Sequence, residues 1–183
     1  SRFPAPGGQE HATIVAVLKN HLTSLEQALK AAQLKPVSFS LAISALQAVT
    51  REGEPPAVAL LVGESNVELQ VTAGSGVVAL RALEGVVETT GNQKHIDADL
   101  VAREIKITLG QLPRTVSENV RKLRVFGRPD LAGPLLRDLR ARVKGLGIDA
   151  EAGSIPPVNG FALPMIEEFE KLTQNVIYVS ATP

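Results

Sequence analysis

The residues of this sequence that could do chemistry lie mainly in two glycine-containing turns. Gly63, Glu64 and Ser65 follow an apolar run at 57–62, and a GSG turn at 74–76 follows an alternating run at 67–72. Backbone N–H groups in such turns can bind an anion, although polar glycine turns are also ordinary hairpin connections. The second turn lacks the Gly-x-x-x-x-Gly-Lys-Ser/Thr frame of a P-loop. The first turn therefore remains a candidate phosphate loop, and the second is interpreted as a plain turn.

Nucleophile and metal patterns are missing from the sequence. There is no cysteine and no Gly-x-Ser-x-Gly elbow, and none of the three histidines belongs to a His-x-x-x-His pair. His95 lies near Asp97 and Asp99, but acidic residues at the start of a helix are explained by capping and by the helix dipole. We therefore expect no catalytic residue and no metal ligand. Asp97 is expected to cap the helix that follows it.

Composition limits the partners that the chain can have. The 183 residues carry 19 basic and 19 acidic side chains, with no Trp and one Tyr. A neutral, aromatic-poor chain has little attraction to nucleic acid, and no apolar run reaches the roughly 20 residues that span a bilayer. Arg137, Arg140 and Lys144 share one helical face, which is usually solvated, and docking of an acidic partner there remains open. The chain begins with Ser1 and has one methionine, so we expect it to be part of a longer protein.

The pattern from residue 57 onward predicts a mixed sheet. Three short strands at 57–62, 67–72 and 77–83 form an antiparallel meander. A helix from about 97 to 109, a strand at 120–126, a helix capped by Asp130, a strand at 148–152 and a helix around 165–172 follow. Alternation of helices and strands after a meander predicts a mixed α/β sheet with helices on both faces. This is the element order of the ribonuclease H-like fold, which is also the repeating half of actin-like ATPases.

The residues before the sheet predict a smaller unit. Residues 1–11 are rich in Pro and Gly and are expected to form a flexible arm. Residues 12–54 predict a small subdomain: a strand at 12–18, a helix at 21–33 capped by Asn20, a strand at 35–40 and a short helix at 42–49. The charged, proline-ended segment at 51–56 is expected to separate it from the larger domain at 55–183.

Two stretches carry a family resemblance. Residues 12–49, with the turn AAQLKPV at 31–37, and the helix DLVAREIKITLGQL at 99–112 resemble PilM, an actin-like protein of type IV pilus assembly that is related to FtsA. The resemblance implies an actin-type second domain, with a phosphate loop at Leu61, Val62 and Gly63 and an adenosine loop at Val125, Phe126 and Gly127.

This sequence departs from the family at both loops. Leu61 stands where the family has an acidic residue, and an apolar side chain cannot ligate Mg²⁺. Phe126 stands in the glycine triplet, where we expect it to obstruct a base. Gly63, Glu64, Ser65 and Gly127 are therefore the cofactor-binding candidates, in degenerate loops, and no ATP or Mg²⁺ is expected to bind this chain tightly.

The resemblance also implies a function. It implies a non-catalytic scaffold of a type IV pilus or related secretion machine, which binds the cytoplasmic tail of a PilN-like inner-membrane protein. The protein is then expected in the cytoplasm, held at the inner membrane through partners, with homo-oligomerisation of the full-length protein left open. The alternative is an ATP-binding actin-like ATPase of which this chain is the second half.

Overall fold

The apolar run at 57–62 forms β4 (Ala57–Val62), the central strand of a five-stranded sheet. The computed structural model describes residues 2–4, 10–12, 16–36, 40–41, 43, 46, 55–74, 76–91, 93–154 and 177–178. The strands β5 (Val67–Ala73) and β6 (Gly76–Leu83) continue from β4 as an antiparallel meander. On the other side, β9 (Lys122–Gly127) and β10 (Asp149–Ala152) add in parallel. The order is β10-β9-β4-β5-β6, in which β5 alone runs opposite to the others, so the predicted meander and the parallel fourth strand are confirmed.

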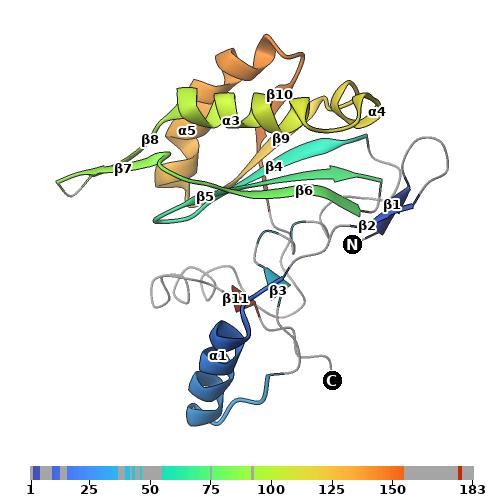
Figure 1. Cartoon of the computed structure of the whole chain (residues 1–183). Coiled ribbons are helices and arrows are strands. Elements are labelled where there is room, and N and C mark those ends of the chain that lie inside the picture. Colours follow the sequence, from blue (N-terminus) through green and yellow to red (C-terminus); the bar gives the residue numbers. More distant parts are fainter. Residues whose placement is uncertain are drawn as a thin grey trace.

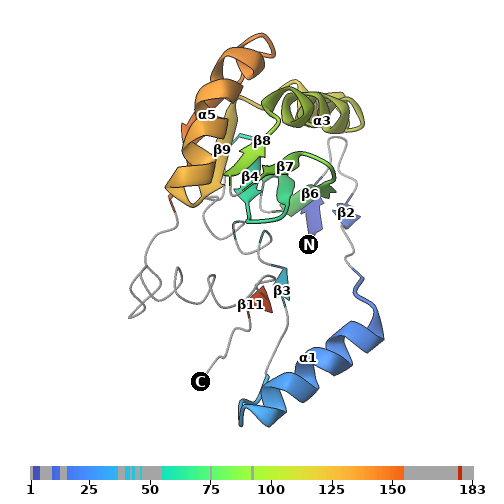
Figure 2. The same ribbon diagram turned by 90° about the vertical axis from the view of Figure 1, so that its left-hand side faces the viewer.

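Two helices, α3 (Ala98–Gly110) and α5 (Pro129–Lys144), lie side by side on one face of this sheet (Figure 1 and Figure 2). Alternate residues of each strand point to that face, as the two-residue period of a strand requires. The short helix α4 (Arg114–Ser117) adds Val116 to the same core. Its fully buried members include Val58, Leu60, Val67, Leu69, Val71, Val101, Ile105, Leu123, Leu135, Leu139 and Val143.

The opposite face of the sheet carries a second, smaller apolar cluster. Ile43, Leu46 and Phe126 are buried there, with Ala59, Leu61 and Leu80 packed against them. The helix expected around 165–172 and most of the one expected at 42–49 lie outside the described residues. The structure therefore establishes helices on one face of an α/β sheet, and the expectation of helices on both faces stays a prediction.

A hairpin stands where the sequence predicted only a loop around Gly91. The strands β7 (Val87–Thr90) and β8 (Gln93–Ile96) pair antiparallel, and the hairpin projects beyond the sheet (Figure 1). Its base is fixed by the core, because Val86 and Ile96 are buried and the Asp97 N–H donates to the Val86 carbonyl over 2.9 Å. The loop prediction was wrong because four-residue strands with an exposed outer half give little apolar alternation.

Three predicted helix caps have different outcomes. Asp97 caps α3 as predicted, since its carboxylate accepts from the N–H groups of Asp99 and Leu100. Asp130 is not the N-cap of α5, because that position belongs to Arg128 and the helix starts at Pro129, a residue suited to a first turn. Likewise α1 (Lys19–Ala31) begins one residue before Asn20, with Leu18 at the N-cap.

Besides the five-stranded sheet with its helices and the β7–β8 hairpin, the described residues form two small strand pairs and α1. Within the expected flexible arm, β1 (Arg2–Pro4) pairs with β2 (Glu10–Ala12). The two-residue strands β3 (Ser40–Leu41) and β11 (Ile177–Tyr178) also pair. The strand expected at 12–18 is not continuous, since residues 16–18 are described without strand structure and 13–15 lie outside the described residues, as do 51–54 at the expected boundary.

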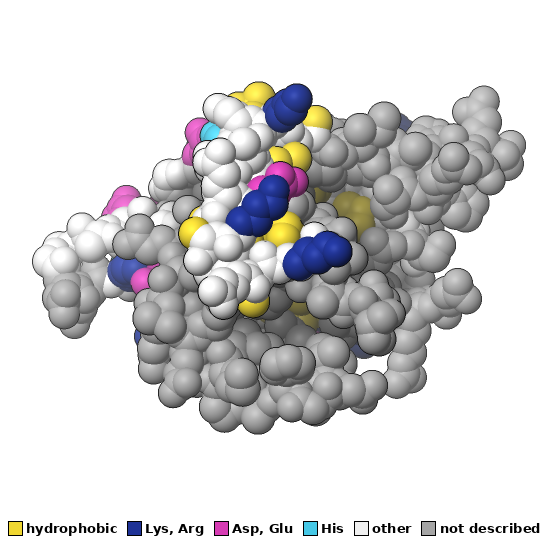
Figure 3. All heavy atoms as spheres, turned by 90° about the horizontal axis from the view of Figure 1, so that it is seen from below, with side chains coloured by type: hydrophobic (Ala, Val, Ile, Leu, Met, Phe, Trp, Pro, Cys, Tyr) yellow, Lys and Arg dark blue, Asp and Glu magenta, His cyan; other side chains and the backbone are white. Residues whose placement is uncertain are grey.

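The helix α1 lies apart from the five-stranded sheet (Figure 2). None of its residues is buried, and Leu18 and Leu34 at its two ends are 66% and 58% exposed. Viewed from below, hydrophobic side chains lie at the surface among Lys, Arg and acidic side chains (Figure 3). The predicted amphipathic helix is present, and its leucine face is only half-buried.

Candidate functional site

The fold brings the two candidate loops together at one edge of the sheet. Val62, the last residue of β4, lies opposite Gly127, the last residue of β9, in the parallel register. Gly63, Glu64 and Ser65 therefore leave β4 beside the point where Arg128 leaves β9. Open α/β sheets bind ligands at the carboxyl ends of parallel strands, so the four candidate residues lie where a site is expected.

Gly127 has a structural reason to be glycine. Its φ is +144°, and a Cβ there would lie 2.6 Å from the Val62 carbonyl oxygen. A side chain is excluded by the neighbouring strand whether or not a ligand approaches. The Gly63 N–H donates to the Asn66 carbonyl over 2.9 Å, which closes the turn that carries Glu64 and Ser65.

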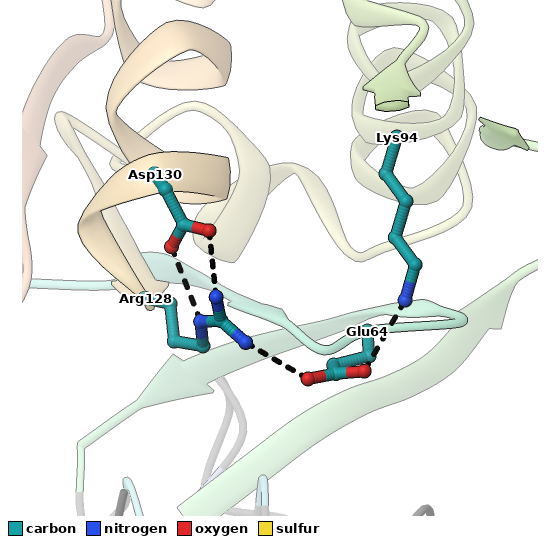
Figure 4. Close-up of polar contacts among 4 residues, drawn as sticks. All are labelled: Glu64, Lys94, Arg128 and Asp130. Carbon is teal, nitrogen blue, oxygen red and sulfur yellow. Dashed lines mark hydrogen bonds and ion pairs between the residues drawn. The ribbon is translucent and has the colours of Figure 1, made fainter. Parts of the chain in front are cut away.

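A cluster of four charged side chains occupies this edge (Figure 4). We call it the ion cluster: Glu64, Lys94, Arg128 and Asp130. Glu64 accepts from the Lys94 ammonium over 3.2 Å and from the Arg128 guanidinium over 2.9 Å. Arg128 also donates to both oxygens of Asp130, over 3.1 Å and 2.8 Å. The cluster joins the turn after β4, the hairpin strand β8 and the first turn of α5.

The charges of the ion cluster compensate one another. The hydrogen bond from Lys94, together with its charge, lowers the pKa of Glu64 below its ordinary 4.5, and Arg128 adds to this effect. The hydrogen bond from Arg128 lowers the pKa of Asp130, and Asp130 in turn raises the pKa of Arg128. The cluster combines two basic and two acidic side chains, so its formal charges cancel.

The Asp130 carboxylate lies in the first turn of α5. Helix N-termini attract anions through their unpaired N–H groups and the helix dipole. The backbone N–H groups of Asp130 and Leu131 contribute to lowering the pKa of the Asp130 carboxyl, so the protein's own carboxylate already interacts with the start of α5. An incoming phosphate would meet this carboxylate and that of Glu64.

The two residues that depart from the family pattern are packed in apolar surroundings. Leu61 lies in β4 and contacts the small cluster on the sheet face opposite α3 and α5. Phe126 is only 3% exposed and lies within β9, so the expectation of a loop at 125–127 is corrected: all three residues belong to the strand. A Cβ at Gly153 would come within 2.4 Å of the Phe126 ring, so the ring packs directly on the Gly153 backbone. Neither position offers an oxygen ligand to a metal.

Asp97 and Asp99, the acidic residues near His95, have structural partners. Asp97 caps α3, and the Arg142 guanidinium donates to both Asp99 oxygens over 2.7 Å and 2.9 Å. His95 is exposed on β8. Within the described ranges no three His, Cys, Asp or Glu side chains gather as a metal site would require.

Lys94 is the member of the ion cluster that sequence reasoning missed. It lies in a hairpin interpreted as a loop, so nothing placed it near Glu64, which is 30 positions away. The available signal for a hairpin here was the turn residue Gly91 (φ +62°) after the β-branched residues Val87, Thr89 and Thr90.

Comparison with known proteins adds no identification. Neither a scan against protein-family models nor a search of curated proteins finds a match to this chain. In the part of the chain that the structure describes, no helix combines the length and apolar character needed to cross a bilayer.

Proposed function

We propose that this chain is a non-catalytic scaffold domain of the ribonuclease H-like, actin-type fold. It serves in type IV pilus assembly or a related secretion machine, as a PilM-like protein that binds the cytoplasmic tail of a PilN-like inner-membrane partner. In this role the protein is cytoplasmic and is held at the inner membrane by binding that partner.

The strand order supports the fold part of the proposal. A meander of three strands, followed by two parallel strands added on the other side of the first, gives the order β6-β5-β4-β9-β10 with one antiparallel strand. This is the arrangement expected for half of an actin-like protein. The sequence resemblance at 12–49 and 99–112 points to the pilus-assembly branch of that fold.

The ion cluster is the main observation in support of a non-catalytic role. At the edge of the sheet where a nucleotide phosphate is expected, Glu64 and Asp130 already pair with Lys94 and Arg128. A phosphate would have to replace these carboxylates, and like charges close together repel. Leu61 contributes no oxygen for Mg²⁺, so the metal that normally accompanies ATP lacks a ligand from β4.

Titration calorimetry with Mg-ATP, alongside titration with a synthetic peptide of the partner tail, tests this function. The proposal expects saturable binding of the tail peptide, no binding of its scrambled version, and a dissociation constant for Mg-ATP well above about 10 µM, equivalent to about −7 kcal/mol. Mg-ATP binding at or below that value would favour the actin-like ATPase instead.

A further inference from the structure

The helix α1 carries an apolar stripe that stays partly open at the surface. Leu22, Leu25 and Leu29 are only half-buried, and no residue of the helix is buried. Leu18, at the N-cap, is 66% exposed. The helix lies apart from the five-stranded sheet (Figure 2). Apolar side chains in such a stripe normally pack against another element, so the stripe of α1 remains accessible to a partner.

The spacing of this stripe is that of a helix pair. Its members are separated by four, three, four and three residues: Leu18, Leu22, Leu25, Leu29 and Ala32. This alternation is the a/d pattern of a heptad repeat, in which two helices interlock along a narrow seam. Every large apolar residue between Lys19 and Ala31 falls on this seam. The spacing therefore favours a second helix with the same stripe as the partner, rather than a sheet.

Two charged side chains flank the seam on the same side. Lys19 and Glu26 each directly follow a leucine of the d position, so both occupy the e position of the heptad. When two copies of α1 run antiparallel, Leu22 faces Leu25 of the second copy. Lys19 then lies near Glu26 of the second copy, and the twofold symmetry forms this pair twice. A parallel pair would not bring Lys19 near Glu26, so the charges favour the antiparallel arrangement.

The end of α1 sets the length of the seam. Gln33 has a φ of +61°, and the Leu34 N–H donates to the Leu29 carbonyl over 2.8 Å. A left-handed residue followed by such a bond across the last turn is the geometry that terminates a helix. The seam from Leu18 to Ala32 therefore spans about two heptads. Because pairing buries only these few side chains against the cost of association, we expect a weak dimer that forms at high protein concentration.

We propose that α1 is a self-association site, at which two copies of this chain pair through their leucine stripes as an antiparallel two-helix coiled coil. A second copy is favoured over an unrelated partner because the same helix supplies both the seam and the charges that complement each other across it. Pairing needs no change in the five-stranded sheet, and the proposal does not depend on the proposed function.

Sedimentation equilibrium of the whole chain, from about 1 µM to about 1 mM protein, tests this proposal. The mass is expected to rise with concentration from that of one copy toward that of two. Leu25→Glu puts a charge in the middle of the seam and is expected to weaken pairing at least about tenfold, because an unpaired charge is costly to bury. The matched control is Gln27→Glu, which adds the same charge at an exposed position of α1 and is expected to leave pairing within about twofold.

Circular dichroism separates a loss of pairing from a loss of folding. Because Leu25 is not buried within one copy, Leu25→Glu is expected to keep the helix content of the unaltered protein. A chain that stays monomeric up to about 1 mM, a dimer that Leu25→Glu leaves intact, or unfolding of this variant would overturn the proposal.

A charge reversal tests the identity and orientation of the partner helix. Lys19→Glu alone, or Glu26→Lys alone, places like charges opposite each other at both pairs, so each is expected to weaken pairing about threefold or more. The double variant, Lys19→Glu with Glu26→Lys, restores both pairs and is expected to return the dissociation constant to within about twofold of the unaltered protein. A double variant that stays as weak as the single variants would show that Lys19 and Glu26 do not meet across the seam, which overturns the antiparallel pairing proposed for α1.

Discussion

At the residue scale, Gly127 shows that a glycine which the sequence suggests for ligand binding can be required for strand packing alone. Its positive φ and the 2.6 Å approach to the Val62 carbonyl leave no room for a side chain. The pairing of β4 and β9 is therefore a sufficient reason for glycine at this position.

Replacing Gly127 by alanine is therefore expected to destabilise the fold by about 1–3 kcal/mol, from backbone strain and the contact with β4. The matched control is Gly133→Ala in α5, where an added Cβ meets nothing within 4 Å. That variant is expected to gain about 0.5–1 kcal/mol from helix propensity. Urea unfolding midpoints measure both, and equal effects of the two variants would contradict the steric explanation.

Glu64 is the residue on which the ion cluster depends. Glu64→Gln removes the charge that attracts both Lys94 and Arg128, so the hairpin is expected to become more mobile. Faster amide hydrogen exchange in β8 and around residue 128, with unchanged exchange in β5, is the predicted result.

Glu88→Gln is the matched control for that substitution, because Glu88 is exposed on β7 of the same hairpin. It is expected to leave exchange unchanged. If Glu64→Gln also leaves β8 unchanged, the Glu64–Lys94 pair does not hold the hairpin.

At the element scale, the main core is a helix layer packed on a sheet. Leu139 of α5 is 0% exposed and packs in that core. Truncation to alanine is expected to cost about 2–5 kcal/mol, because it removes buried methyl groups and leaves a cavity. Ile107→Ala on α3, at a 41% exposed position, is the control and should change stability by less than about 0.5 kcal/mol. Comparable losses in the two variants, by urea unfolding, would contradict the layer assignment.

Acid is expected to loosen the contacts between elements. Arg142 lowers the pKa of Asp99 and links α3 to α5, while the ion cluster lowers the pKa of Glu64 and Asp130. A depressed pKa in the folded state gives stability that is present above the ordinary values of 3.8 for Asp and 4.5 for Glu, and that is lost as pH falls through the folded values. Glu68 acts in the opposite direction, because burial raises its pKa.

Unfolding midpoints between pH 7 and pH 3 check this. The decline below about pH 4.5 should be shallower in Asp99→Asn than in the unaltered protein, because one linked carboxylate is gone. Parallel decline of the two proteins would show that the Asp99–Arg142 pair contributes no pH dependence.

At the scale of the whole molecule, the sequence predicts the sheet better than the site. Apolar runs such as 57–62 and the repeated leucines of α5 are strong periodic signals, and they placed the meander, β9 and both covering helices correctly. Lys94 was missed because its contact with Glu64 depends on a short hairpin with little apolar pattern. Asp130 was misplaced as a cap because the helix starts two residues earlier, with Arg128 at the N-cap and Pro129 as its first residue. The charge balance of the ion cluster is a property of the fold that no local pattern contains.

We propose above all that this chain binds a protein partner, and that the ion cluster at the carboxyl ends of β4 and β9 disfavours nucleotide binding. One calorimetric comparison, in which the same protein is titrated with the partner tail peptide and with Mg-ATP, tests it most directly. The account predicts saturable heat with the tail peptide, none with its scrambled version, and a Mg-ATP dissociation constant well above about 10 µM. Tight Mg-ATP binding at or below about 10 µM, together with no heat from the tail peptide, would contradict it.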